Sequence, residues 1–263
     1  MIRCANATEL YDAMFMQIAS NGYERQSVDA HSPETNSVHE AQLGTSYELR
    51  NHAHNVVGSR SIDLRWAAAS VLHFFSATER AGVLRRYNKH ASRFLCDDQL
   101  IGAYGVETVP SINACIERLK QFPSSRRAVA SLGGLNSLEE NCNLPRCISS
   151  LHFIIGRSGL ELLVYQRSLS LGVMPYDCVL LCNVLEYASA ALCVLPFALK
   201  WFVGSLHAKA TLFEHASNPR NQGMLLPACI LADRCACEEC LHHPNRLPEP
   251  FKSWLLNESE VRT

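Results

Sequence analysis

A thiol flanked by arginines is the feature of this sequence most able to do chemistry. Cys147 follows Arg146 in the run Asn-Leu-Pro-Arg-Cys, and Arg167 and Ser168 come about one hairpin later. Cysteine attacks as a thiolate, and nearby positive charge lowers its pKa. Arginine offers a planar fork of donors that matches phosphate oxygens. The spacing indicates a thiolate that adds to a pyrimidine ring while guanidinium groups hold a phosphate, although a single cysteine is more often a packing residue.

Three further motifs contain side chains suited to the same substrate. An arginine pair, Arg126-Arg127, follows Pro-Ser-Ser, Asp177 ends Met-Pro-Tyr-Asp, and His207 ends Val-Gly-Ser-Leu-His. Each motif has an ordinary alternative, respectively a solvated charged pair, a helix N-cap and a hydrogen-bonded core histidine. Their order along the chain, together with the thiol, favours one shared site.

In order and spacing these motifs resemble those of the thymidylate synthase superfamily, which includes the folate-dependent CMP and dCMP hydroxymethylases. The resemblance covers most of residues 5–216. It implies a single α+β domain over residues 1–263, with a mixed or antiparallel central sheet, flanking helices and a homodimer formed through the sheet. It also implies 5,10-methylenetetrahydrofolate as the cofactor and a pyrimidine nucleoside monophosphate as the substrate.

The resemblance assigns a role to each matching position. Cys147 corresponds to the nucleophile that adds to C6 of the base, and Arg167 and Ser168 correspond to phosphate ligands. Arg126 and Arg127 correspond to an arginine pair that reaches the phosphate bound by the partner subunit. These expectations place most of the substrate's charge beside arginine.

Four other positions complete the expected site. Tyr104, in Gly-Ala-Tyr-Gly, resembles an active-site tyrosine near the thiol and C5, and His207 resembles a contact to a sugar hydroxyl. Lys209 stands where the family has a sugar-binding tyrosine, which suggests a changed sugar preference or an added phosphate contact. Arg146 has a role only through its adjacency to the thiol. Cys147 and Tyr104 are therefore the expected catalytic residues.

Asp177 bears on the choice of base. The synthases usually have asparagine there, an amide that donates to O4 of uracil and accepts from its N3–H. A carboxylate instead accepts from the N4 amino group of cytosine and pairs with a protonated N3. The sequence thus predicts C5 hydroxymethylation of CMP or dCMP. C5 methylation of UMP or dUMP, and a nucleotide-binding homologue that has lost catalysis, remain alternatives.

The sequence departs from the family pattern at positions that move protons. Ser70 occupies the position of the family's catalytic glutamate, and Ser170 that of an aspartate two residues after Arg-Ser. Glu79, one or two turns later, is a possible substitute. Because general acid–base help is worth orders of magnitude in rate, these changes fit either a new nucleotide specificity or a decayed site.

Composition narrows the class of protein. The 263 residues include 24 Lys and Arg against 25 Asp and Glu, so the chain lacks the basic excess of a general nucleic-acid binder. The opening Met-Ile-Arg-Cys shows no secretion signal, and many cysteines sit in apolar runs, which favours reduced thiols and a cytoplasmic setting.

The run from 178 to 199 is near the length of a membrane span, but Asn183, Glu186 and Ser189 interrupt it. A buried core helix and no membrane partner are expected.

A cluster of cysteine and histidine lies near the carboxyl end. Cys237 and Cys240 have the spacing of half a zinc knuckle, and His242 and His243 follow them. No matching second pair lies at the required distance. No metal is expected.

Hydrophobic spacing and turn residues predict the elements that position these groups. Helices are expected from Thr8 as N-cap to Asn21, over about 64–87, and from Ser111 to Pro123. Strands are expected over 45–49, 55–57, 128–132 and 200–206, with a hairpin over 148–166 around Gly156–Gly159 and a short helix over 209–216. Residues 23–42 are polar and patternless and are expected to form a surface loop, and 217–263 a C-terminal extension.

Overall fold

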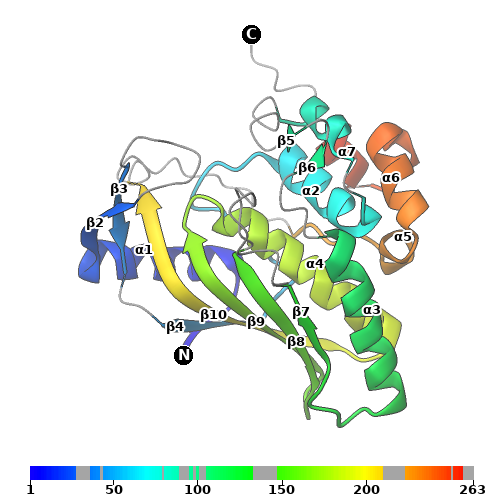
Figure 1. Cartoon of the computed structure of the whole chain (residues 1–263), viewed down its shortest axis with the longest axis horizontal. Helices are drawn as coiled ribbons and strands as arrows, with labels where there is room; N and C mark the ends of the chain where they lie inside the picture. The colour runs from blue at the N-terminus through cyan, green and yellow to red at the C-terminus, as the bar shows by residue number, and fades with distance from the viewer. Residues whose placement is uncertain are drawn as a thin grey trace.

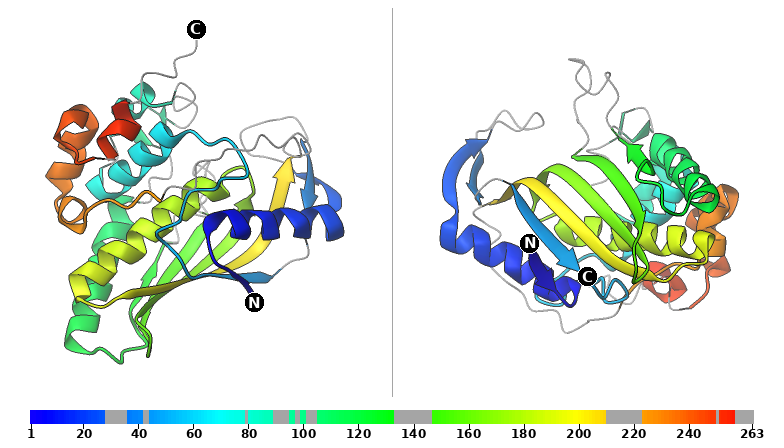
Figure 2. Two further views of the ribbon diagram at one scale, coloured as in Figure 1. Left: turned by 180° about the vertical axis from the view of Figure 1, so that it is seen from behind. Right: turned by 90° about the horizontal axis from the view of Figure 1, so that it is seen from below.

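Helices cover one face of a mixed β-sheet, and among the described residues the other face of the sheet carries none (Figures 1 and 2). The computed structural model describes residues 1–27, 36–41, 44–78, 80–88, 95–96, 99–100, 105–132, 147–209, 223–249 and 251–256. The strands in these ranges are β1 (Ile2–Cys4), β2 (Tyr23–Ser27), β3 (Asn36–Glu40), β4 (Thr45–Leu49), β5 (Leu95–Cys96), β6 (Gln99–Leu100), β7 (Val129–Ser131), β8 (Ile148–Ile155), β9 (Leu160–Ser170) and β10 (Pro196–Lys209). The helices are α1 (Ala7–Asn21), α2 (Leu64–Ser76), α3 (Gly105–Gln121), α4 (Met174–Leu192), α5 (Ala228–Ala232), α6 (Arg234–His242) and α7 (Phe251–Leu256), with 3-10 turns η1 (Gly82–Arg86) and η5 (Pro244–Arg246).

The main sheet has the strand order β1-β4-β10-β9-β8-β7, with β2 and β3 attached through β10. The strand pairs β7–β8, β8–β9 and β4–β10 are antiparallel, whereas β9–β10 and β1–β4 are parallel. The expected α+β fold with a mixed sheet and flanking helices is confirmed. Because β8 runs opposite to β9 and β10, its amino end lies beside their carboxyl ends.

Alternation along β9 separates the core from the uncovered face. Leu160, Leu162 and Val164 are fully buried, while Tyr165 on the other face is 39% exposed.

The expected β8–β9 hairpin is confirmed, with its turn closed by the bond from Gly156 N–H to the carbonyl of Gly159, 2.8 Å. Gly159 has φ of +139°, and a Cβ there would lie 2.2 Å from the carbonyl oxygen of Leu195, so glycine is required.

Helix α4 is the core of the helical layer and is buried on most of its sides. It ends where Cys193 adopts a left-handed conformation with φ of 55°, and β10 begins at Pro196. The expected buried helix over 178–199 is therefore confirmed only as far as residue 192. No helix in the described ranges has the length and apolarity needed to cross a membrane.

Several expected boundaries are wrong. The expected loop over 23–42 contains β2 and β3, which pair antiparallel with each other. Strand β3 also pairs antiparallel with the carboxyl end of β10. The sequence did not predict these strands because they lack an alternation of apolar side chains, and the backbone hydrogen bonds that form them at a sheet edge need none. The first helix is capped by the Asn6 side chain, which accepts from the Glu9 N–H at 2.9 Å, and Thr8 lies inside the helix.

The helices near the middle of the chain also differ from expectation. Helix α2 ends at Ser76, so the expected helix over 64–87 breaks into α2 and the separate turn η1. Helix α3 begins at Gly105, six residues before the expected cap Ser111, and contains Pro110. Residues 55–57, expected as a short strand, form a buried coil, whereas the strand expected over 128–132 is present as β7. Lys209 ends β10 and does not begin a helix, and residues 210–216 lie outside the described ranges.

Two fully buried asparagines tie the C-terminal segment to the domain. The Asn183 amide of α4 donates to the carbonyl of Met224 at 2.8 Å and accepts from the Leu226 N–H at 2.7 Å. The Asn55 amide donates to the same carbonyl at 3.0 Å and accepts from the Met224 N–H at 2.8 Å. Helices α5, α6 and α7 then pack against α2. The expected extension is thus part of the core in its described residues.

Replacing Asn183 with alanine tests this attachment. The buried Leu226 N–H would lose its acceptor, so we expect Asn183→Ala to lower the free energy of unfolding by about 2–4 kcal/mol in urea titrations. The exposed Asn21→Ala is a matched control, expected to change it by less than about 0.5 kcal/mol. Equal effects of the two substitutions would contradict this account of the attachment.

Candidate active site

Four predicted site residues converge at one end of the sheet because of the strand directions. Cys147 directly precedes β8, Arg167 and Ser168 lie near the carboxyl end of β9, and His207 near that of β10. In the parallel β9–β10 pair, Ser205 is opposite Ser168. Helix α4 starts a few residues beyond β9, so its first turn lies at the same end (Figure 1).

Cys147 lies within the electrostatic reach of two predicted ligands. Its carbonyl accepts from the Arg167 N–H at 2.9 Å, and the residue is partly exposed. Burial raises the pKa of the Cys147 thiol, the positive charge of Arg167 opposes that rise, and the negative charge of Asp177 adds to it. The thiol, the guanidinium and the carboxylate therefore belong to one electrostatic site.

A register shift beside the thiol alters the strand locally. The β8–β9 pairing shifts between Ile148 and Ser150, and the Ser149 hydroxyl donates to the carbonyl of Tyr165 at 2.7 Å. A bulge of this kind bends and twists its strand and can re-aim the neighbouring side chains. The irregularity comes immediately after Cys147, where the direction of the thiol matters most.

Asp177 lies in the first turn of α4 and is held by a buried amide. The Gln166 Nε2 donates to Asp177 Oδ2 at 3.2 Å, and the Trp201 Nε1 donates to Gln166 Oε1 at 2.9 Å. Burial raises the pKa of Asp177 to about 6, and the hydrogen bond from Gln166 limits the rise. The carboxyl group is thus mostly ionised at neutral pH and still able to take a proton in mildly acidic solution.

His207 is accompanied by a buried carboxylate that the sequence did not indicate. His207 on β10 pairs in register with Glu40 on β3 and with Ser170 on β9. Glu40 is buried and accepts from the Tyr23 hydroxyl at 3.1 Å and from the Ser205 hydroxyl. Directly paired residues have side chains on the same face, so the polar groups of Glu40, Ser205 and His207 lie along one side of the strand ends.

The predicted arginine pair lies at the other end of the sheet. Arg126 and Arg127 are exposed in the turn between α3 and β7, and the next carbonyl, of Ala128, accepts from the Phe153 N–H at 2.9 Å. Six residues along β8 separate Phe153 from Cys147, a distance of about 20 Å at the usual rise of a strand. Within one chain, the pair is therefore not brought to the thiol.

The remaining predicted positions are distributed as follows. Tyr104, Arg146 and Glu79 lie outside the described residues. Lys209 is exposed at the end of β10. Ser70 is partly exposed on α2.

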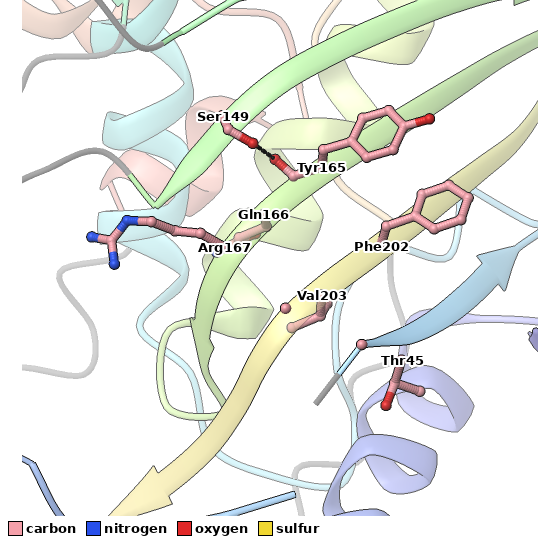
Figure 3. A pocket seen from close by; sticks show the side chains of 9 residues that line it. Thr45, Ser149, Tyr165, Gln166, Arg167, Phe202 and Val203 are labelled. Atoms are coloured by element: carbon pink, nitrogen blue, oxygen red, sulfur yellow. Dashed lines mark hydrogen bonds between the residues drawn. The ribbon is translucent and has the colours of Figure 1, made fainter. Parts of the chain in front are cut away.

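A pocket of about 300 Å³ lies where β9 and β10 pass the start of β4. Figure 3 shows Tyr165 and Phe202 side by side at one end, with Arg167 extending in the opposite direction. The two rings stack with their centroids 5.0 Å apart and their planes 10° apart. Gly204 in the pocket lining leaves no room for a side chain, because a Cβ there would lie 2.7 Å from the Arg167 carbonyl oxygen of the neighbouring strand. Arg167 therefore connects the thiol's end of the sheet with its uncovered face.

The cysteine and histidine cluster forms part of a helix in the C-terminal segment. Cys237 and Cys240 are buried on α6, which packs on α2, whereas Cys235 is exposed. In the described ranges, no three His, Cys, Asp or Glu side chains are grouped so as to hold a metal ion. Burial raises the pKa of the Cys237 thiol to about 12, which keeps it in the neutral form.

Comparison with known proteins identifies the family. Residues 9–211 match the family model described as thymidylate synthase. The chain belongs to the thymidylate synthase family. The thymidylate synthase family transfers one-carbon units to C5 of pyrimidine nucleotides, and this chain is a one-carbon transferase of that nucleotide-binding class.

A solved structure gives independent support for the fold of this thymidylate synthase family member. Thermostable thymidylate synthase A from Bacillus subtilis aligns with a TM-score of 0.65 at 18% sequence identity, over 78% of this chain and 81% of that chain. No curated protein matches the sequence. At this identity the structural likeness supports the fold, while the family match supports the class of chemistry.

Gln166, Trp201 and Glu40 have contacts at the site that sequence reasoning did not predict. Gln166 carried a usable signal, since it follows Leu162 and Val164 at the buried positions of an alternating strand. A glutamine at such a position must satisfy its amide inside the protein. Glu40 carried no such signal, because its strand lacks an apolar alternation.

The opposing charges beside Cys147 predict a pair of opposite effects on the thiol. At pH 7.5, where Asp177 is ionised, Asp177→Asn should lower the thiol pKa and speed alkylation by iodoacetamide roughly threefold. Arg167→Gln should raise the pKa and slow alkylation by a similar factor. Mass spectrometry of the Cys147 peptide measures both rates, with exposed Cys193 as the internal control. Changes of the same sign in both variants would contradict this arrangement.

Proposed function

We propose that this protein hydroxymethylates C5 of a cytidine monophosphate, CMP or dCMP, through a covalent bond between Cys147 and C6. The observation that carries the proposal is the electrostatic proximity of the Cys147 thiol to Arg167 and Asp177. A nucleophile, a cation and a carboxylate at one end of the sheet match the three parts of a cytosine nucleotide that the reaction must hold. They are C6, the phosphate and the N3–N4 edge.

Each described residue then has a defined task. Arg167 and Ser168 bind the phosphate. The negative phosphate then offsets part of the positive charge of Arg167, which otherwise lowers the pKa of the Cys147 thiol. The Cys147 thiolate adds to C6, which makes C5 nucleophilic. Asp177 accepts a hydrogen bond from the N4 amino group and stabilises the protonated N3 of the adduct. His207 contacts a sugar hydroxyl, and Tyr104, Arg146 and Lys209 remain proposed contacts around this core.

We propose 5,10-methylenetetrahydrofolate as the one-carbon donor, as is usual for the family. The partly exposed Cys147 and exposed Arg167 fit this proposal, since a second and larger substrate can approach a base held between them. When bound, the folate supplies the methylene carbon that C5 captures, and addition of water or hydride then gives the hydroxymethyl or methyl product. The residues of this chain bind the nucleotide and hold its base in one orientation beside the Cys147 thiol.

Two other functions are specified by particular residues. C5 methylation of UMP or dUMP would be the reaction if Asp177 bound the edge of uracil despite its carboxylate. A nucleotide-binding homologue without turnover is favoured by Ser70, Ser170 and Lys209, which replace polar groups of the family pattern. The two alternatives differ in a simple assay, because only the first forms dihydrofolate.

An exchange assay across CMP, dCMP, UMP and dUMP separates these functions. With methylenetetrahydrofolate and formaldehyde, we expect CMP or dCMP to lose its C5 hydrogen to solvent and to gain a hydroxymethyl group. Cys147→Ser should reduce both rates by at least about a thousandfold, because the hydroxyl is a far weaker nucleophile. Tritium release and product mass measure the two steps.

The matched control for this assay is Cys193→Ser, since Cys193 is an exposed thiol at the end of α4. It should react at the rate of the parent protein. Retention of the parent rate by Cys147→Ser would end the proposal of covalent catalysis. Nucleotide-dependent stabilisation without any exchange would favour the homologue without turnover, and dihydrofolate formation with uracil nucleotides would favour methylation.

We further propose a homodimer in which the uncovered faces of two sheets meet. Figure 2 (right) shows the uncovered face of the sheet, with the described helices behind it. This face carries the stacked rings of Tyr165 and Phe202. The distance between Cys147 and the arginine pair supports the same idea. A second copy could bring its Arg126 and Arg127 to the phosphate that the first copy cannot reach with its own.

Mixing two inactive variants tests this arrangement. Cys147→Ser and the double variant Arg126→Ala/Arg127→Ala each disable a different subunit's contribution to one site. After joint refolding, half of the dimers are mixed and one of their two sites is intact, so about a quarter of the parent activity should return. Exchange of C5 hydrogen measures it. Mixed dimers recovered by differential tags without any activity would contradict shared sites, and mixtures prepared without refolding are the control.

A further inference from the structure

Gln166 is a polar side chain at a core position of β9. It is 3% exposed, and its strand neighbours on the same face, Leu162 and Val164, are fully buried. Its amide lies between β10, which carries Trp201, and α4, which carries Asp177. An amide kept at such a depth is stable only if its donors and its acceptor are satisfied, and here all of them are.

The partners of Gln166 fix the direction of its amide. The indole Nε1–H of Trp201 can only donate, so the atom that faces it at 2.9 Å must be the oxygen Oε1. The carbonyl of Ser168 can only accept, so the atom that faces it at 3.0 Å must be the nitrogen Nε2. Turning the amide over would break both hydrogen bonds and bring like atoms together. The second N–H of Nε2 is therefore committed to Asp177.

This commitment determines how residue 177 can be used. Oδ2 of Asp177 accepts from Gln166 at 3.2 Å, so it serves as an acceptor whatever the substrate. Oδ1 is the atom left for other partners, and any proton that the carboxyl group takes must reside on it. Trp201 is fully buried, which leaves the indole no other hydrogen-bonding position and keeps the arrangement rigid.

We propose that Gln166, oriented by Trp201, is the positioning residue that sets base specificity by dictating which atom of residue 177 faces the pyrimidine. The proposal rests on the proposed function in one respect, namely that Asp177 meets the edge of the base. It adds a cause for the discrimination, because the identity of residue 177 alone does not define which of its two polar atoms is presented.

The same device gives opposite outcomes for aspartate and asparagine. Aspartate presents an oxygen, which accepts from the N4 amino group of cytosine. An asparagine at this position must turn its oxygen toward the Gln166 donor, so its NH₂ group faces the base and donates to O4 of uracil. Reversing the polarity of residue 166 should therefore reverse the preference of an asparagine at 177.

Binding of CMP, dCMP, UMP and dUMP by calorimetry tests the proposal without requiring turnover. The parent protein should prefer the cytosine nucleotides, and Asp177→Asn should prefer the uracil nucleotides, each by about tenfold or more. The double variant Asp177→Asn/Gln166→Glu should return to cytosine, because the introduced carboxylate accepts from the asparagine NH₂ and turns its oxygen outward. A merely structural role for Gln166 would weaken binding of all four nucleotides and leave their ratio as in Asp177→Asn.

A second double variant keeps the test decisive if the carboxylate prevents folding. Asp177→Asn/Gln166→Met has an apolar side chain of similar size, so the asparagine is free to turn and the preference should fall toward one. Tyr165→Phe, on the opposite face of β9, is the control and should leave the parent's ratio unchanged.

The outcomes separate the two proposals. If the parent binds none of the four nucleotides, the proposed function fails and the role of Gln166 fails with it. If the parent prefers cytosine but Asp177→Asn does not shift the ratio, Asp177 does not face the base and Gln166 cannot act through it. If Asp177→Asn shifts the ratio and both double variants keep the shifted value, only the inference about Gln166 is overturned.

Discussion

Parallel pairing of β9 with β10 is the constraint on which the arrangement of the site depends. It aligns the carboxyl ends of two strands, and the antiparallel β8 adds its amino end beside them. Cys147, Ser168 and His207 thus come together from positions sixty residues apart. The connection that parallel pairing requires is α4, and the first turn of this helix brings Asp177 to the same place. One topological choice therefore brings a thiol, a hydroxyl and a carboxylate to one end of the sheet.

Buried side-chain amides join several elements of this domain and fix their relative orientation. Gln166 joins β9, β10 and α4 beneath the site, and Asn183 and Asn55 join α4 to the segment around Met224. Each amide has both a donor and an acceptor, so it can hold two elements in one orientation only, whereas apolar contacts tolerate small rotations. This distribution suits the proposed discrimination between cytosine and uracil, which depends on the direction of hydrogen bonds.

The C-terminal helices extend the domain beyond the part that the family match covers. The match ends at residue 211, whereas the helices α5 to α7 pack on α2. Tyr87 donates to the carbonyl of Leu241 at 2.7 Å and gives the packing a specific polar contact. Helix α2, which carries Ser70, thus has an additional helical layer upon it.

The sequence by itself determined the hairpin and the buried helix and indicated candidate site residues, because these depend on residue types and on local periodicity. The Gly156–Gly159 turn and the alternation before Arg167 are local signals of this kind. Only the tertiary structure decided that β2 and β3 are strands, since Tyr23–Ser27 and Asn36–Glu40 gain their order from pairing with each other and with β10. It likewise decided which groups meet. The distance of Arg127 from Cys147 and the hydrogen bonds that join Gln166 to Trp201 and Asp177 follow from strand direction and from packing between elements far apart in the chain, and no spacing along one sequence encodes them.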